Sequence, residues 1–320
     1  MNIKNVSLFG ILFAFVVIAL GAWTRLVDAG LGCPDWPGCY GFVFFPTTEA
    51  EVALAEQRYP AFPYEIDKAI PEVVHRYFAA ALGLLAIFIV YLTHKTENKQ
   101  NKRISIFLLI FICCQGLFGY LTVSLKLLPI IVTTHLFGGF ITLSTFFYLY
   151  IKNSNFFTNF QIGHLKNIGM LALFILVIQI FLGVWTSTNY ASLACPDFPT
   201  CQGSFLPDMD FSSGFNLAQE VGPNYLYGLL ENEARVAIHY SHRITAILLT
   251  IIFLVLISKL WFSSAAPLAS TLGIVLLTQI SLGIMNVVYV LPLYIAIAHN
   301  LVAALLLLTT LYVNMLAWKK

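Results

Sequence analysis

The stretch Pro71-Glu72-Val73-Val74-His75-Arg76-Tyr77 opens an apolar run, Phe78 to Leu92, that is long enough to enter a membrane. It places a carboxylate, an imidazole and a guanidinium at the mouth of that run. Ionisable side chains at such a depth are costly to bury, so they indicate a functional site. The stretch has an echo, Ala237-Ile238-His239-Tyr240-Ser241-His242-Arg243, which again opens an apolar run. Pairing His75 with His242 gives an offset of 167 residues.

The composition indicates a membrane protein. The 320 residues are 59% hydrophobic and 10% charged, with a mean hydropathy of +0.84, whereas a soluble domain carries about 25% charged residues. We therefore expect an all-α integral membrane protein with eight transmembrane helices. They are expected at about residues 6–23, 73–93, 104–124, 130–151, 168–186, 239–260, 267–287 and 292–317. A net charge of only +2 gives no sign of nucleic-acid binding.

The distribution of charge predicts the orientation of the chain. The short connections and the two termini hold ten basic residues, and of the 15 acidic residues only Glu97 lies with them. By the positive-inside rule both termini are cytoplasmic, and the long loops 24–72 and 187–238 are external. The ten basic residues are Lys4, Lys95, Lys99, Lys102, Arg103, Lys152, Lys166, Lys259, Lys319 and Lys320.

The echo belongs to a repeat that runs through the chain. Four landmarks recur at offsets of 162 to 164 residues: Cys33-Pro34-Asp35-Trp36-Pro37-Gly38-Cys39 with Cys195-Pro196-Asp197-Phe198-Pro199-Thr200-Cys201, Gln115–Gly119 with Gln279–Gly283, Leu128-Pro129 with Leu291-Pro292, and His135 with His299. The repeat predicts two pseudo-symmetric tandem four-helix bundles, residues 1–160 and 161–320, related by an axis along the membrane normal. Gly21-Ala22-Trp23-Thr24 also recurs, at Gly183, which favours a retained first helix over a cleaved signal peptide.

Two pairs of histidines suggest two haem sites. In an up-down bundle the second and fourth helices are diagonal neighbours. His75 is four residues past Pro71 and His135 six past Pro129, which places them at similar depths. Such a pair can ligate one planar group, and His242 with His299 repeats the arrangement. Zinc is less favoured, since no pair has i, i+4 spacing and no further ligands are evident. The alternative for each histidine alone is a polar residue bonded to a neighbouring helix.

The residues around the histidines have two interpretations each. Arg76 and Arg243 suit haem propionates, or they snorkel to the membrane surface. The close pairs Cys33 with Cys39 and Cys195 with Cys201 predict disulfides, either structural or redox-active. Two further cysteines, Cys113 and Cys114, lack a repeat partner and are expected to be inert packing residues.

Glu72 breaks the symmetry between the two copies. It lies three residues before His75 on the same helix face, and its counterpart before His242 is His239. A carboxylate beside a haem can act in proton transfer, so the first copy is the candidate reaction chamber and the second suits electron transfer. The alternative is that Glu72 only caps a helix end. His239 is either a spare ligand or an interfacial residue.

Taken together, these residues resemble the haem A synthase family over essentially the whole chain. The motifs that carry the resemblance are Thr24-Arg25-Leu26, the two cysteine loops, Glu72-x-x-His75-Arg76, His135, Gly222-Pro223-Asn224-Tyr225, Glu233-Ala234-Arg235, His239-x-x-His242-Arg243 and His299. The resemblance implies eight helices in two bundles. It also implies oxidation of one methyl group of haem O to a formyl group, which yields haem A for terminal oxidases.

The resemblance also implies roles for individual residues. Glu72 is then catalytic, His75 and His135 ligate the iron of the substrate haem, and His242 and His299 ligate the iron of a haem b cofactor. The Cys33–Cys39 pair places the chain in the bacterial, cysteine-containing branch. Expected partners are a haem O synthase that supplies the substrate, terminal oxidase assembly and membrane lipid, with no nucleic acid; a homo-oligomer is compatible with this. The expected location is the inner (cytoplasmic) membrane, as a multi-pass protein.

Three other classes compete with this interpretation. A di-haem membrane electron-transfer protein would need the four histidines, with Glu72 incidental. A quinone-linked disulfide oxidoreductase would use the external cysteine pairs, with Cys113 and Cys114 as possible relays. Tandem repeats also occur in transporters. A carboxylate in only one copy favours the enzyme over the carrier, and the histidine pairs favour haem over disulfide exchange.

Overall fold

The computed structural model describes residues 2–154, 160–263 and 265–319, so Lys320 of the basic set lies outside it. Within these ranges the chain is helical, without a strand, and eight helices are long and apolar enough to cross a membrane. They are α1 (Ile3–Leu26), α3 (Ile66–His94), α4 (Lys99–Ser124), α5 (Pro129–Lys152), α6 (Lys166–Thr188), α8 (Asn232–Phe262), α9 (Ala266–Val288) and α10 (Leu293–Ala317). The short elements are α2 (Glu49–Arg58), η1 (Gly163–Leu165) and α7 (Phe211–Gly214). The expected all-α fold with eight spans is confirmed.

Two helices begin well before the expected residue. The apolar pattern predicted starts at 73 and 239, whereas α3 starts at Ile66 and α8 at Asn232. Hydropathy follows the hydrocarbon layer, and both helices continue beyond it through polar turns. Pro71 is therefore inside α3 rather than at its start. Pro71 was thus the wrong reference point, since His75 is nine residues from the first residue of α3 and His135 six from that of α5. The expected similar depth of the two histidines is nevertheless confirmed, because their ring centroids lie 6.4 Å apart.

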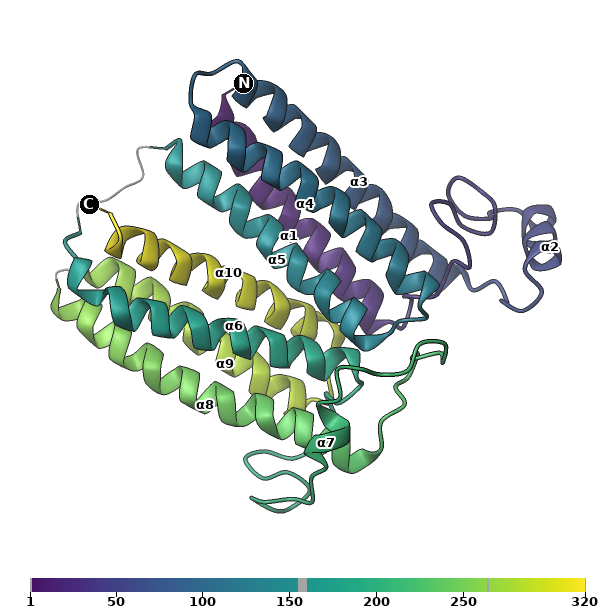
Figure 1. Cartoon of the computed structure of the whole chain (residues 1–320). Helices are drawn as coiled ribbons and strands as arrows, with labels where there is room; N and C mark the ends of the chain where they lie inside the picture. Colours follow the sequence, from purple (N-terminus) through teal and green to yellow (C-terminus); the bar gives the residue numbers. More distant parts are fainter. Residues whose placement is uncertain (1, 155–159, 264, 320) are drawn as a thin grey trace. The chain divides into compact units, whose positions relative to one another are not determined.

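The first compact unit comprises Met1–Asn153 and Ala218–Tyr227. Its four long helices pack as a bundle in which α1 contacts α3 and α5, and α4 contacts the same two (Figure 1). Among the described residues the backbones of α3 and α5 are not adjacent, so the two helices lie diagonally across the bundle, as an up-down arrangement requires. The segment 218–227 joins this unit, since the Tyr225 N–H donates to the Lys126 carbonyl at 3.0 Å.

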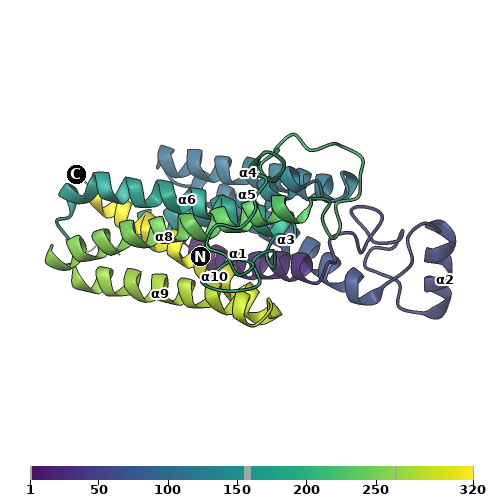
Figure 2. The ribbon, with the colours of Figure 1, turned by 90° about the horizontal axis from the view of Figure 1, so that it is seen from below.

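The second compact unit comprises Ser154–Leu217 and Gly228–Lys320. In it α6 contacts α8 and α10, and α9 contacts the same two (Figure 2). In the described part of this unit the backbones of α8 and α10 are not adjacent, and the two helices are again diagonal. In both units, therefore, the second and fourth long helices, which carry the histidines, face each other across the bundle.

A small folded layer covers the loop end of the first unit. The long loop between α1 and α3 contains α2, which starts with a capping box between Thr48 and Glu51 and lies beyond the ends of the bundle helices (Figure 1). Its buried cluster includes Cys33, Cys39, Tyr40 and Ala55 from the loop, together with Ala69 and Val73 of α3. The loop is thus anchored on the first turns of α3, directly above the ionisable stretch.

Candidate functional site

His75 on α3 and His135 on α5 meet across the first bundle. Their ring centroids are 6.4 Å apart and the rings are nearly perpendicular, at 88°. Two imidazole–metal bonds of about 2.0–2.1 Å, with the radius of each ring added, span roughly 6 Å. The Nδ1 atoms of both rings are buried without a hydrogen-bond partner among the described residues. An unpaired buried imidazole nitrogen is costly in a core and suits a ligand position.

His242 on α8 and His299 on α10 form the corresponding pair in the second bundle. The two rings are close enough to interact electrostatically. The amide nitrogen of Gln179 on α6 lies 3.1 Å from His242 Nδ1. The amide nitrogen of Gln279 on α9 lies 3.2 Å from His299 Nε2. The structure thus brings both predicted histidine pairs together, each within one unit.

A glycine on the neighbouring helix faces each of the four histidines. Any other residue there would place a Cβ at 2.9 to 3.5 Å from the histidine Cε1, which is closer than ordinary van der Waals contact at three of the four positions. The pairs are Gly21 with His75, Gly119 with His135, Gly183 with His242, and Gly283 with His299. These glycines lie in the repeated motifs, but the sequence analysis gave them no role. The sequence did contain a signal for these glycines, because they recur between the two copies at nearly the same offset as the histidines.

Glu72 is buried at the loop end of α3, with 5% of its surface exposed. Its Oε2 accepts a hydrogen bond of 2.9 Å from the Cys33 N–H. Its Oε1 forms an ion pair with Arg76, one helical turn further on. Both oxygens therefore have a donor, and the carboxylate is held on the helix face that carries His75.

Arg76 and Arg243 bind the cysteine loops. Arg76 Nη1 donates to the carbonyls of Asp35, at 2.9 Å, and Gly38, at 2.6 Å. Arg243 makes the same type of contact in the second unit, with 2.8 Å bonds to the carbonyls of Asp197, Thr200 and Cys195. The sequence analysis gave these arginines two interpretations, contact with propionates or snorkelling to the membrane surface, and missed these contacts with the loops. The propionate contact stays a prediction.

His239, which replaces Glu72 in the second copy, is held at both ring nitrogens. Its Nδ1 lies 3.0 Å from the Ala191 carbonyl, and its Nε2 accepts a 3.2 Å hydrogen bond from Arg243. The ring is therefore neutral, with its proton on Nδ1. Because both nitrogens are used, His239 is a support for Arg243 rather than a spare iron ligand.

Disulfides close both cysteine loops, Cys33–Cys39 and Cys195–Cys201, as predicted. Asp35 accepts hydrogen bonds from the Tyr40 and Gly41 amides, and Asp197 does the same for the Gln202 and Gly203 amides. These four amides belong to two-residue turns in which both residues have positive φ, and each turn reverses the chain just after the second cysteine. The aspartate of the motif therefore holds the turn, a role that the sequence analysis missed.

Two titratable groups of these loops have shifted pKa values. The Thr200 hydroxyl and the Gly203 and Gln202 amides lower the pKa of Asp197 to about 2. Burial, followed by the charge of nearby Glu65, raises the pKa of Tyr40 to about 12. Tyr40 stays neutral and donates to the Pro63 carbonyl at 3.0 Å. In contrast to the disulfide cysteines, Cys113 and Cys114 on α4 are exposed free thiols, so their expected packing role was wrong.

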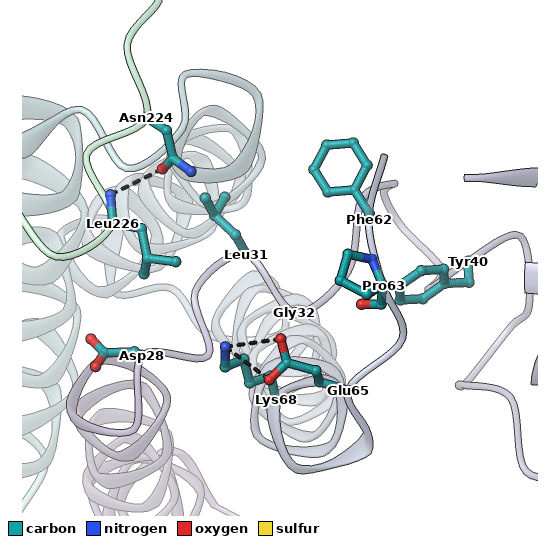
Figure 3. Close-up of a pocket in the computed structure, with 10 residues that line it drawn as sticks. All are labelled: Asp28, Leu31, Gly32, Tyr40, Phe62, Pro63, Glu65, Lys68, Asn224 and Leu226. Atoms are coloured by element: carbon teal, nitrogen blue, oxygen red, sulfur yellow. Dashed lines mark hydrogen bonds and ion pairs between the residues drawn. The ribbon is translucent and has the colours of Figure 1, made fainter. Parts of the chain in front are cut away.

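A pocket opens on the loop side of the first unit (Figure 3). It is lined by Asp28, Leu31, Gly32, Tyr40, Phe62, Pro63, Glu65, Lys68, Asn224 and Leu226. Figure 3 shows Lys68 paired with Glu65, with Nζ 2.9 Å from Oε2. Gly32 lies against the Lys68 backbone, where a Cβ would come within 2.4 Å of the Lys68 carbonyl oxygen. Gly32 lines the pocket and directly precedes Cys33, whose amide holds Glu72. The pocket wall is therefore one residue along the chain from that amide.

The donor set of each bundle suits haem better than a free metal ion. Among the described residues no three His, Cys, Asp or Glu side chains gather into a metal-binding group. A haem needs only axial ligands from the protein, because the porphyrin supplies four nitrogens. Two opposed histidines, each packed on a glycine, provide such ligands from two sides.

Eight helices long and apolar enough to cross a membrane, with two disulfide-closed loops and a half-buried pair of histidines in each unit, define a polytopic helical membrane protein. Residues 4–311 match the COX15-CtaA family, described as cytochrome oxidase assembly protein, and the chain belongs to this family. It is 41% identical over 314 residues to a haem A synthase of Shewanella oneidensis, which covers 97% of this chain and 95% of the relative. More distant haem A synthases are those of Rickettsia bellii, 27% identical over 95% of this chain and 96% of the relative, and Neorickettsia sennetsu, 26% identical over 93% of each.

Proposed function

We propose that this protein is a haem A synthase, a membrane oxidoreductase that converts a methyl group of haem O to a formyl group. The observation that carries the proposal is the environment of Glu72. A buried carboxylate lies one helical turn from a ligand histidine in the first bundle. In the second bundle a neutral imidazole, His239, occupies the corresponding position. Two bundles that only carried electrons would have no need for this difference.

In this proposal the two histidine pairs hold different haems. His75 and His135 hold the iron of the substrate, haem O, and the first bundle, residues 1–160, is the reaction chamber. His242 and His299 hold the iron of haem b in the second bundle, residues 161–320. When bound, haem b supplies one-electron redox chemistry. The close approach of each ring to a glycine, and the 6.4 Å between the His75 and His135 centroids, support the binding of a haem by each pair.

Glu72 is the proposed catalytic base. The Cys33 amide and Arg76 hold its two oxygens, so the carboxylate keeps a fixed position on the face of α3 that carries His75. From there it can take up a proton as the methyl carbon is oxidised, or stabilise positive charge that develops on that carbon. General acid–base help of this kind is typically worth about 10²–10⁴-fold in rate.

The remaining assignments concern the surroundings of the site. Arg76 and Arg243 directly follow the ligand histidines, and in this proposal their guanidinium groups, which also hold the cysteine loops, contact haem propionates. Haem O would come from a haem O synthase, and haem A would pass to terminal oxidase assembly. The distribution of lysine and arginine supports a multi-pass protein of the inner membrane with both termini cytoplasmic.

The test replaces Glu72 with glutamine in cells that are supplied with haem O. Glu72→Gln keeps the shape of the side chain and removes its charge. Haem O should accumulate and haem A should fall by at least roughly tenfold, while haem b stays bound. The matched control is Glu65→Gln. Glu65 lies at the start of the same helix and is exposed, and its carboxylate forms an ion pair only with Lys68 among the described residues. The measurement is the haem O to haem A ratio by chromatography of extracted haems.

The runner-up function is a di-haem electron carrier, which the two matched histidine pairs would also serve. A Glu72→Gln protein that makes haem A at the wild-type rate would remove Glu72 from the mechanism. Purified protein that holds two haems b and no haem O or haem A would favour the carrier.

A further inference from the structure

Besides the glycines, a second position next to the histidines recurs on four helices. Three of the four residues at this position are polar and one is apolar. The position is found four residues, about one helical turn, before each histidine-facing glycine, and therefore on the same helix face. The residue there is Gln115 on α4, Gln179 on α6 and Gln279 on α9, but Val17 on α1. Val17 is the counterpart of Gln179, so the two bundles differ at this position beside their first ligand histidine.

In the second bundle both glutamines contact the ligand rings. The Gln179 amide nitrogen lies 3.1 Å from His242 Nδ1 and donates to the His242 carbonyl, also at 3.1 Å. The Gln279 amide nitrogen lies 3.2 Å from His299 Nε2. An amide offers both a donor and an acceptor, so it can bond whichever ring nitrogen is not bound to iron. The Oε1 atoms of both glutamines are buried and have no partner among the described residues, which leaves this second function available.

In the first bundle the rings lack this side-chain support among the described residues. The backbone of the same four positions interacts with all four rings, at Val17 and Gln115 as at Gln179 and Gln279, so the difference between the bundles lies in the side chains. Val17 has no side-chain donor or acceptor for His75. Gln115 packs over Gly138, where a Cβ would come within 1.9 Å of its amide nitrogen, one turn beyond His135. His75 Nδ1, His135 Nδ1 and His299 Nδ1 all have no hydrogen-bond partner in the described parts of the chain, but the His299 ring is held at its other nitrogen by Gln279. The two histidine pairs are thus alike in position but differ in what fixes their rings.

A hydrogen bond to a ligand histidine fixes the orientation and tautomer of the ring, and its loss typically weakens metal affinity by about 10–100-fold. A site with clamped rings retains its haem, and a site with unclamped rings exchanges it more readily. A catalyst that acts on one haem with the help of another needs one site of each kind.

We propose that Val17 is a specificity-determining residue that makes the first bundle the exchanging haem site, whereas Gln179 and Gln279 make the second bundle the retaining site. The assignment of haem O to the first bundle rests on the proposed function. The difference in haem retention between the bundles does not, because it follows from the ring contacts alone.

The test exchanges the two residues and measures haem loss from each bundle. Purified protein in lipid nanodiscs is loaded with haem b, and transfer of the haem to excess apomyoglobin is followed by absorbance. A His75→Ala background isolates the second site and a His299→Ala background isolates the first. Gln179→Val should speed haem loss from the second site by about 10-fold or more, and Val17→Gln should slow loss from the first by a similar factor. Val17→Leu, which adds volume without an amide, should leave the rate within about twofold of wild type.

Two further readouts keep the proposal open to refutation. Gln179→Met removes the amide but keeps the length of the side chain, so it replaces Gln179→Val if that protein does not fold. Haem loss rates that change by less than about twofold in both Val17→Gln and the Gln179 variants would overturn the proposal. If these rates shift as expected while Glu72→Gln still makes haem A, the retention difference stands and only the catalytic assignment falls.

Discussion

The Cys33 N–H donates a 2.9 Å hydrogen bond to Glu72 Oε2, so a half-cystine of the outer loop holds the buried carboxylate directly. Arg76 joins the same network, since it pairs with the other carboxylate oxygen and with the loop carbonyls of Asp35 and Gly38. The Cys33–Cys39 ring, Arg76 and Glu72 therefore form one polar unit. The second bundle builds the equivalent unit around His239, without a carboxylate.

This network predicts different effects for the two disulfides. Cys33→Ser with Cys39→Ser loosens the loop that positions Glu72, so haem A formation should fall by roughly tenfold from lost positioning. Cys195→Ser with Cys201→Ser disturbs a loop that holds His239 and Arg243, and its effect on haem A formation should be several-fold smaller. Haem O and haem A extracted from cells expressing each double variant give the measurement. Equal losses in the two variants would mean that the loops serve stability alone.

The second disulfide loop should respond to acid through Asp197. Its folded-state pKa of about 2 lies below the ordinary 3.8, so the ionised carboxylate stabilises the loop above about pH 4. That contribution is lost as the pH falls from there towards 2. Asp197→Asn should therefore speed reduction of Cys195–Cys201 by a phosphine reductant at pH 5, and the difference from wild type should shrink towards pH 2. A rate difference that does not change with pH would contradict this role.

The glycines that face the histidines should be sensitive to a single added methyl group. Gly183→Ala places a Cβ 3.0 Å from His242 Cε1 and should lower the haem b content of the purified protein several-fold. Gly116→Ala is the control, because nothing lies within 4 Å of the added Cβ. Alanine is also the better helix former by about 1 kcal/mol, so this control should not lose stability. Reduced-minus-oxidised spectra of the two proteins decide, and equal haem contents would remove the steric role of Gly183.

The haem b assignment itself is tested by removing a ligand. His242→Ala or His299→Ala should abolish a stably bound low-spin haem, because one remaining axial histidine cannot hold the iron from both sides. His239→Ala is the matched control, since that ring is engaged by Ala191 and Arg243 rather than left for iron. Unchanged haem content in both ligand variants would sink the assignment.

The sequence predicted the spans and the histidine pairing because both depend on patterns that repeat. Apolar length gave eight helices, and the diagonal position of the second and fourth helices, with the similar depth of the two histidines, placed His75 opposite His135. The start of α3 was misplaced, because hydropathy marks where a helix enters lipid, whereas α3 begins at Ile66 in a polar turn.

The contacts made by the loops could not be predicted in the same way. Arg76 reaches backbone carbonyls some 40 residues earlier, and no side-chain pattern identifies a carbonyl as a partner. The role of Asp35 in the Tyr40-Gly41 turn likewise depends on positive φ angles that the motif alone does not fix. That the His239 ring is uncharged and supports Arg243 follows only from its two contacts, with the Ala191 carbonyl and with Arg243.

The orientation of the chain gives the last prediction. Lysine and arginine are concentrated at the termini and in the short connections, so the disulfide loops and α2 should face the outside of the cell. In a Cys113→Ser/Cys114→Ser background, which removes both free thiols, Glu56→Cys on α2 and Lys99→Cys at the first residue of α4 report on opposite ends of the first bundle. A membrane-impermeant maleimide should label Glu56→Cys in intact cells, with the outer membrane permeabilised where one is present, and label Lys99→Cys only after lysis. Omitting reductant keeps the native disulfide cysteines out of the reaction. The reverse pattern would place the loops, and with them Glu72 and the mouth of the first bundle, on the cytoplasmic side.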